Sequence, residues 1–237
     1  MTPSGQGQAL RPTMPSLDSE LALSSSKGLA LRVLPVGEWQ ENCYLLVDRA
    51  TNEGLLIDPG DEAGRILDWI AGVTVRSILL THAHRDHVGA LAEVRAALGV
   101  VSGLHAGDGA LAAKYDVSAD FRLNDGDVIR LSAHDIRVVH TPGHTQGSVC
   151  LRFDARAIVG DVIFPGGPGH TSTPEELNQS LASLQRTVFT WPDETTLYPG
   201  HGQPTTVGQE RAGFEAFLAR PRPADLCGDV TWGTSPK

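Results

Sequence analysis

Short runs of apolar and β-branched residues alternate along this chain with segments in which apolar residues recur at helical spacing. The short runs predict strands at 29–36, 43–48, 54–57, 75–80, 128–131, 136–140, 148–153, 157–159 and 196–198, separated by turns such as Glu41-Asn42. The helical spacing predicts helices at 61–71, 86–98, 174–189 and 209–218, the first with Asp61 as its N-cap. This order of elements predicts an α/β protein in which two sheets are sandwiched between outer helices.

The first 27 residues differ from the rest, because they are rich in Ser, Pro, Gly and Gln. Such a composition buries too little apolar surface to offset the entropy lost on ordering. We therefore expect a flexible tail at 1–27 and one folded domain at 28–237.

Composition narrows the possible partners. The chain has 237 residues and a formal net charge of −9, which leaves no basic surface for nucleic acid. No apolar run reaches the about 18 residues that span a bilayer, and the three separated cysteines form no CxxC pair, which favours a reducing compartment. We expect a cytoplasmic protein that acts on a small-molecule substrate, without a nucleic-acid or membrane partner, and the oligomeric state stays open.

A dense cluster of metal-ligand side chains follows the apolar run 75–80. His82, His84, Asp86 and His87 place three imidazoles and one carboxylate within six positions. Imidazole nitrogen and carboxylate oxygen are ligands of divalent cations, and alternate residues of an extended turn can direct His82 and His84 to one point. Asp86 and His87 begin the next predicted helix and can face a second point. One motif can therefore supply ligands to two metals.

Three further candidate ligands each stand directly after a β-like run. His144 lies in a Thr-Pro-Gly-His turn, Asp161 follows Gly160, and His201 lies in a Pro-Gly-His-Gly turn. The neighbouring glycines allow the backbone to turn tightly beside a ligand. Singly, each residue is more typical of an ordinary turn or cap, but the set together favours a metal site.

The spacing HxHxDH, the later His144, the Gly-Asp pair and the Pro-Gly-His-Gly turn resemble the metallo-β-lactamase-fold hydrolases. The segments Asn42-Cys43-Tyr44, Ile57-Asp58-Pro59-Gly60 and Gly160-Asp161-Val162-Ile163-Phe164 resemble more narrowly the short, glyoxalase II-like branch. The resemblance covers about residues 29–218. It implies a four-layer αββα sandwich with the metal site at one edge.

The resemblance also implies a role for each candidate residue. The first metal would take His82, His84 and His144, the second Asp86, His87 and His201, and Asp161 would bridge them. Asp86 is also a candidate proton acceptor. Asp58 either hydrogen-bonds a ligand imidazole and fixes its tautomer or is an ordinary turn carboxylate.

These roles predict a dinuclear metallohydrolase of a thioester or related ester. Two nearby dications lower the pKa of a shared water and polarise the substrate carbonyl, so the nucleophile would be a metal-bridging hydroxide. We expect zinc, although iron and manganese accept the same nitrogen and oxygen ligands.

The sequence departs from the glyoxalase II pattern where that family binds glutathione. About 36 residues follow His201, so the family's C-terminal helical domain is not expected. The usual Gly-Cys-Gly with Arg or Lys is replaced by a glycine-rich loop, in which Gly167 and His170 are candidate substrate contacts and His170 is alternatively an exposed loop residue. Two alternatives stay open, a lactonase and a mononuclear non-haem iron persulfide dioxygenase that would use His82, His144 and Asp161.

Overall fold

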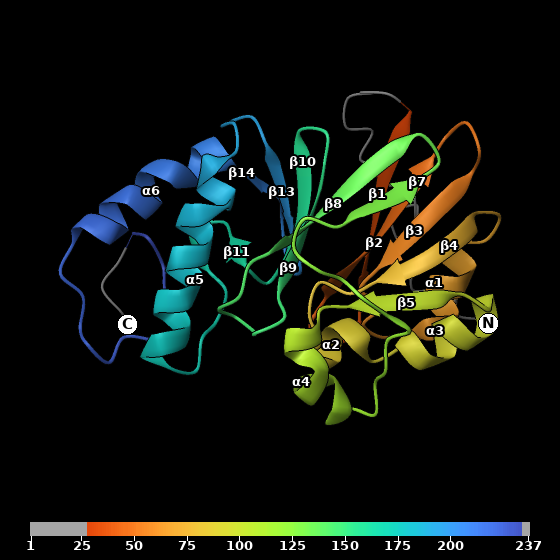
Figure 1. Cartoon of the computed structure of the whole chain (residues 1–237), viewed down its shortest axis with the longest axis horizontal. Coiled ribbons are helices and arrows are strands. Elements are labelled where there is room, and N and C mark those ends of the chain that lie inside the picture. Colours follow the sequence, from red (N-terminus) through yellow and green to blue (C-terminus); the bar gives the residue numbers. More distant parts are fainter. Residues whose placement is uncertain (1–27, 234–237) are drawn as a thin grey trace, which may run out of the picture.

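The computed structural model describes residues 28–233 and shows an α/β fold of four layers (Figure 1). Two six-stranded sheets face each other, and helices cover the outer face of each sheet. The predicted αββα sandwich is therefore confirmed. The predicted tail at 1–27 lies outside the described residues.

The first sheet begins as an antiparallel meander and continues with parallel strands. Its order is β1 (Leu29–Val36), β2 (Glu41–Asp48), β3 (Glu53–Ile57), β4 (Thr74–Leu79), β5 (Val101–Leu104) and β6 (Phe121–Arg122). β1, β2 and β3 pair antiparallel, whereas β3 to β6 pair parallel. Parallel neighbours need crossover connections, which here carry helices to one face of the sheet.

The second sheet is mostly antiparallel. Its order is β14 (Thr205–Thr206), β13 (Thr196–Pro199), β10 (Arg156–Gly160), β9 (Val149–Phe153), β8 (His134–His140) and β7 (Val128–Leu131). The exception is the parallel pair β10 and β13. A small hairpin of β11 (Ile163–Phe164) and β12 (Gly167–Pro168) follows β10.

Six α-helices and two short 3₁₀ turns complete the described fold. They are α1 (Ala63–Trp69), α2 (Arg85–Val88), α3 (Leu91–Leu98), α4 (Gly109–Ala113), α5 (Pro174–Arg186), α6 (Val207–Ala219), η1 (Ala106–Asp108) and η2 (Val188–Thr190). Figure 1 shows α5 and α6 on the side of the sheets opposite α1 and α3. Both long helices begin with a capping box, Thr173 with Glu176 in α5 and Thr206 with Gln209 in α6. No helix in this part of the chain has the length and apolar character needed to cross a bilayer.

Three apolar cores hold the layers together. One lies between the sheets, one between the first sheet and its helices, and one between the second sheet and α5 and α6. β2 contributes to two of them, with Leu45 in the outer core and Leu46 in the central core, and all eight of its residues are buried. Burial on both faces explains the apolar run at positions 43–47 of this strand.

Three sequence-based predictions about local structure are wrong. Glu41 and Asn42 form the start of β2 rather than a turn, and Asp61 does not cap α1, whose N-cap is Glu62 with a left-handed backbone. The predicted helix 86–98 is broken into α2 and α3, because the loop at Pro59 packs against it and the carbonyl of Pro59 accepts a hydrogen bond from the Ala90 amide. β5, β6 and α4 were not predicted.

We expect the contact of Gly60 with α2 to be a point of close packing. A methyl group on Gly60 would overlap the Asp86 carbonyl oxygen and approach Glu41 Oε2 to 2.6 Å. Gly60→Ala should lower the free energy of unfolding by about 2 kcal/mol, measured by chemical denaturation.

Gly64→Ala is the matched control, because a methyl group there meets nothing within 4 Å inside α1. This change should stabilise the protein by up to about 1 kcal/mol through helix propensity. Equal effects of the two changes would contradict the packing of Gly60 against α2.

Candidate metal centre

The candidate ligands come together at the ends of strands from both sheets. His82, His84, Asp86 and His87 follow β4, with the last two in α2. Asp161 follows β10, His201 follows β13, and His144 lies in the loop between β8 and β9. Segments up to 119 residues apart in sequence, from His82 to His201, therefore meet at one edge of the sandwich.

His82, His84 and His144 form a compact three-histidine group. The distances are 3.1 Å from His82 Nε2 to His84 Nδ1, 2.9 Å from His84 Nδ1 to His144 Nε2, and 3.3 Å from His144 Nε2 to His82 Nε2. A tetrahedral metal with bonds of about 2.0 Å separates its ligand atoms by about 3.3 Å. The spacing of these three nitrogens therefore fits one metal ion.

A second set, the Asp86 group, consists of Asp86, His87 and His201. Asp86 Oδ2 lies 3.1 Å from His201 Nε2 and 3.9 Å from His87 Nε2. All three ligand atoms are close enough to one another to hold a single ion. The structure thus brings together both sets of residues that the resemblance implied.

Asp161 lies between the two groups. Its Oδ2 is 3.6 Å from His144 Nε2 and 3.7 Å from His201 Nε2, while its Oδ1 is 3.4 Å from His87 Nε2. One carboxylate therefore faces both the three-histidine group and the Asp86 group.

Two buried atoms at this point lack hydrogen-bond partners among the described residues. They are His87 Nε2 and Asp161 Oδ1. A buried polar atom without a partner is costly, so such an arrangement calls for a group that satisfies it. A divalent cation bound between these atoms would do so, and the nitrogen and oxygen donor set suits such a cation.

The outer nitrogens of the rings are held by hydrogen bonds. His144 Nδ1 donates to the His170 carbonyl at 2.8 Å, and His201 Nδ1 donates to the Trp39 carbonyl at 3.1 Å. Since a carbonyl can only accept, each of these Nδ1 atoms carries a proton, and each Nε2 atom faces the centre. The two rings are thereby preset for metal binding.

Asp58 orients His87. Its Oδ2 accepts from His87 Nδ1 at 3.1 Å and from Thr81 Oγ1 at 2.6 Å, and its Oδ1 accepts from the Thr81 amide at 2.7 Å. The carboxylate therefore joins the ends of β3 and β4 to α2. Of the two interpretations left open for Asp58, this geometry favours the partner of an imidazole.

Burial and charge divide the imidazoles into two classes. Burial, reinforced by neighbouring imidazoles, lowers the pKa of His82 and His84. Burial alone would also lower the pKa of His87 and of His201, but nearby carboxylates raise both pKa values. The main carboxylate is Asp161 for His87 and Asp86 for His201. His82 and His84 are thus set to be neutral, whereas His87 and His201 hold protons more tightly.

The neighbouring imidazoles also act on Asp161. Burial opposes its ionisation, but His87, His144 and His201 lower its pKa to about 2. The carboxylate is therefore ionised near neutral pH, as a metal ligand must be.

Glu41 is a buried carboxyl that sequence analysis missed. Its Oε1 lies 3.6 Å from His87 Nδ1, and neither of its oxygens has a hydrogen-bond partner in the described part of the chain. Burial raises the pKa of Glu41 well above its ordinary value. Because the sequence predicted a turn at Glu41, its burial was not expected. In the structure Glu41 is the first residue of β2, and its side chain is buried.

Asn42 and Tyr44 fasten the loop that carries His201. The Asn42 side-chain amide donates to the carbonyls of Pro199 and Gly202, both at 3.0 Å, and the Tyr44 hydroxyl donates to Pro199 at 2.7 Å. In the sequence, the segment of these two residues stood out only because it resembles the glyoxalase II-like branch. The structure shows that both side chains hold the His201 loop in place.

Asp108 joins the two loops that carry the three-histidine group. Its buried carboxylate accepts from the Ala83 amide at 2.9 Å, from Thr145 Oγ1 at 2.8 Å and from the Gly147 amide at 2.6 Å. The sequence did not indicate this role, because Asp108 is a single aspartate in a segment without strand or helix periodicity.

Neither of the two predicted substrate contacts joins a ligand group, although the His170 carbonyl accepts the hydrogen bond from His144 Nδ1. The His170 side chain is 55% exposed and its Nδ1 lies 3.0 Å from Asp229 Oδ1. Gly167 packs against Val230, whose carbonyl oxygen a methyl group at Gly167 would overlap. Their contact with substrate stays a prediction.

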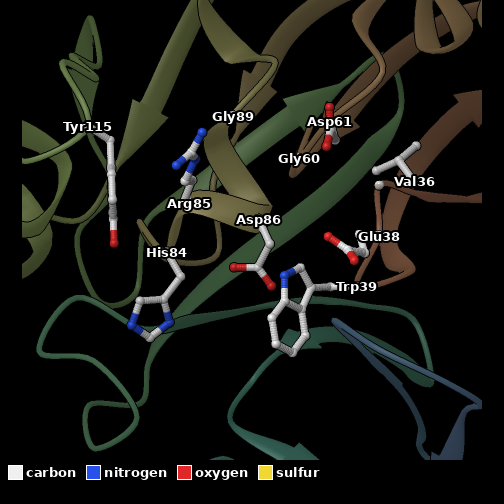
Figure 2. Close-up of a pocket in the computed structure, with 11 residues that line it drawn as sticks. Val36, Glu38, Trp39, Gly60, Asp61, His84, Arg85, Asp86, Gly89 and Tyr115 are labelled. Atoms are coloured by element: carbon white, nitrogen blue, oxygen red, sulfur yellow. The ribbon is translucent and has the colours of Figure 1, made fainter.

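A cavity of about 700 Å³ opens beside the ligands. His84 and Asp86 form its inner wall, and Figure 2 shows both among the residues that surround it. Its volume is typical of sites for small molecules. A substrate in this cavity would contact one member of each ligand group.

Comparisons with known proteins agree with the geometry. The family model of the metallo-beta-lactamase superfamily matches residues 36–201. A hydroxyacylglutathione hydrolase, GloC of Haemophilus influenzae, is 32% identical over 76% of this chain and 94% of its own length.

Similar solved structures include proteins of several kinds. The B3 metallo-beta-lactamase BLEG-1 has a TM-score of 0.68 at 31% identity and covers 77% of this chain and 96% of its own. TTHA1623, in a di-iron-bound form, has a TM-score of 0.65 at 34% identity, with coverages of 76% and 96%. ETHE1 from Myxococcus xanthus has a TM-score of 0.67 at 28% identity, with coverages of 81% and 92%.

The opposite pKa shifts predict a stepwise loss of metal on acidification. A protonated imidazole cannot bind metal, and the raised pKa values of His87 and His201 keep these rings protonated to higher pH than His82 and His84. As the pH falls, the Asp86 group should therefore release its metal first. Elemental analysis after dialysis at descending pH measures this order.

Two variants assign the steps. His84→Ala leaves the Asp86 group and should lose its remaining metal at a higher pH than His201→Ala, which leaves the three-histidine group. The reverse order would contradict the electrostatic division of the site.

Proposed function

The chain belongs to the metallo-beta-lactamase superfamily, and we propose that it is a dinuclear metallohydrolase that cleaves a thioester or a related ester. The single observation that carries the proposal is the complete Asp86 group beside the three-histidine group, with Asp161 facing both. The glyoxalase II-like relative GloC supports a thioester as the substrate.

We assign the ligands as the sequence implied. His82, His84 and His144 would hold one metal, Asp86, His87 and His201 the other, and Asp161 would contact both. Two divalent metals at such a pair of sites supply an acidified water as nucleophile and polarise the substrate carbonyl. We propose zinc, and the same donors accept iron or manganese.

Asp86 is the proposed proton acceptor. Its side chain is 30% exposed and lines the cavity, so it reaches both solvent and a bound substrate. Burial opposes its ionisation, but the hydrogen bond from His201 leaves the pKa of Asp86 below its ordinary value. It is therefore ionised at neutral pH, which is the form that a proton acceptor must have.

A thiolate is the leaving group that this site suits best. A thiol has a pKa of about 8.5, so it departs as an anion without a strong acid beside it. Of the residues that line the cavity, Arg85 is permanently protonated, and the carboxyl groups present are those of Glu38, Asp61 and Asp86. An alkoxide from a lactone is the related case and keeps a lactonase within the proposal.

A mononuclear iron persulfide dioxygenase is the second candidate. His144 Nε2 lies 3.3 Å from His82 Nε2 and 3.6 Å from Asp161 Oδ2, and together these three residues offer two imidazoles and one carboxylate, the donor set of non-haem iron oxygenases. The similarity to ETHE1 of Myxococcus xanthus favours testing it. The intact Asp86 group favours the hydrolase, because a mononuclear site does not use it.

Metal content and thiol release test the two functions together. The purified protein should contain about two metals per chain and release thiol from S-D-lactoylglutathione. Nitrocefin hydrolysis serves as a comparison, because a similar structure is that of a β-lactamase. One iron per chain with oxygen uptake on a persulfide and no thiol release would contradict the hydrolase.

His201→Ala separates the functions by site. Loss of one ligand of the Asp86 group should reduce thiol release by about 100-fold or more and lower the metal content toward one per chain. His134→Ala is the control, since its ring lies 3.4 Å from Asp48 and takes no part in either ligand group. Unchanged turnover in His201→Ala would exclude a role for the second metal.

A further inference from the structure

The rim of the cavity carries two exposed aromatic side chains. In residues 28–233 the large hydrophobic side chains with high exposure are Trp39, Val101, Tyr115 and Val128. Both aromatic members, Trp39 at 76% exposure and Tyr115 at 39%, line this one cavity. Apolar surface left in water and gathered beside a cavity indicates a place where a ligand covers it.

Trp39 is tied to the metal centre through its backbone. Its carbonyl accepts the hydrogen bond from His201 Nδ1, so the turn between β1 and β2 stands at a fixed place beside the ligands. Figure 2 shows the Trp39 ring beside Asp86 and the Tyr115 ring on the far side of His84 and Arg85. The two rings therefore flank the inner wall of the cavity.

Arg85 is the permanent cation among the residues that line the cavity. It is exposed, and its side chain makes no ion pair or hydrogen bond with another residue in the described part of the chain. Figure 2 shows its guanidinium group near Tyr115 and Gly89. An arginine in a cavity with no protein partner is available to a ligand.

The charges of the cavity are separated. Three carboxylates line the cavity with Arg85: Glu38 and Asp61 lie on the side of Val36 in Figure 2, away from the guanidinium, and Asp86 belongs to the Asp86 group of candidate metal ligands. An anionic group is repelled near these carboxylates and attracted near Arg85. The cavity therefore has one place that favours a carboxylate.

We propose that Arg85 binds a carboxylate on the substrate while Trp39 and Tyr115 cover its apolar part, so that the enzyme selects thioesters that carry a carboxylate. A guanidinium matches a carboxylate with two parallel hydrogen bonds, which makes it a specificity determinant rather than a general attraction. The selection among thioester substrates rests on the proposed function, whereas the binding of a carboxylate at Arg85 does not.

Paired substrates that differ only in charge test the selection. The S-D-lactoyl thioesters of 3-mercaptopropionate and of its methyl ester have the same acyl group and nearly the same shape. Arg85→Gln should raise KM for the acid by about tenfold or more, leave KM for the methyl ester unchanged and leave kcat for both nearly unchanged. Thiol release measures both.

Two further variants control for charge and for folding. Arg85→Lys should recover part of the affinity for the acid, because the charge stays while the planar fork is lost. Arg186→Gln removes an exposed arginine from the end of α5 and should change neither KM. Equal changes of KM for the acid and the ester in Arg85→Gln would overturn the proposal.

Binding without turnover separates this inference from the proposed function. Calorimetry with 3-(benzylthio)propionate and its methyl ester uses ligands that cannot be hydrolysed at the sulfur. The wild-type protein should bind the acid more tightly, and Arg85→Gln should remove the difference. If no thioester is cleaved but this difference is found, the proposed reaction fails and the carboxylate site stands; if the acid and the ester bind wild type equally, the carboxylate site fails.

Discussion

Two buried carboxylates hold the loops on which the metal centre depends. Asp58 accepts hydrogen bonds from Thr81 and His87, and Asp108 accepts from Ala83, Thr145 and Gly147. Hydrogen bonds to a charged acceptor are about twice as strong as neutral ones, and a buried carboxylate left unpaired is costly. The segments after β4 and before β9 are therefore fixed relative to each other before any ligand binds.

The same arrangement concentrates unlike charge in a small volume. Asp161 faces three imidazoles, and the mutual effect lowers its pKa to about 2 while the pKa of His87 is raised. Each buried charge is stabilised by the opposite charge beside it. Removing one partner would leave the other buried and unpaired, which destabilises the fold. This arrangement also explains why His87 and His201 bind protons more tightly than His82 and His84.

Most of the candidate metal ligands and most of the cavity walls come from different parts of the fold. The ligands stand at the ends of strands buried in the sandwich, where the backbone is held by sheet pairing. The cavity walls come from a turn, from the segment after α4 and from the exposed side of α2. Loops tolerate change better than strands, so the walls can vary while the ligand positions do not.

The sequence by itself determined the fold class, most of the strands and long helices, and the set of candidate ligands. Strand and helix periodicity is local, and the density of histidine around His84 is too high for an ordinary loop. Only the tertiary structure decided the roles of Glu41, Asn42 and Asp108, the break between α2 and α3, and the pairing of Arg85 with two exposed rings in one cavity. Asn42, for example, bonds to Pro199, 157 positions away. Such contacts depend on how distant segments pack, and no local pattern of residues records them.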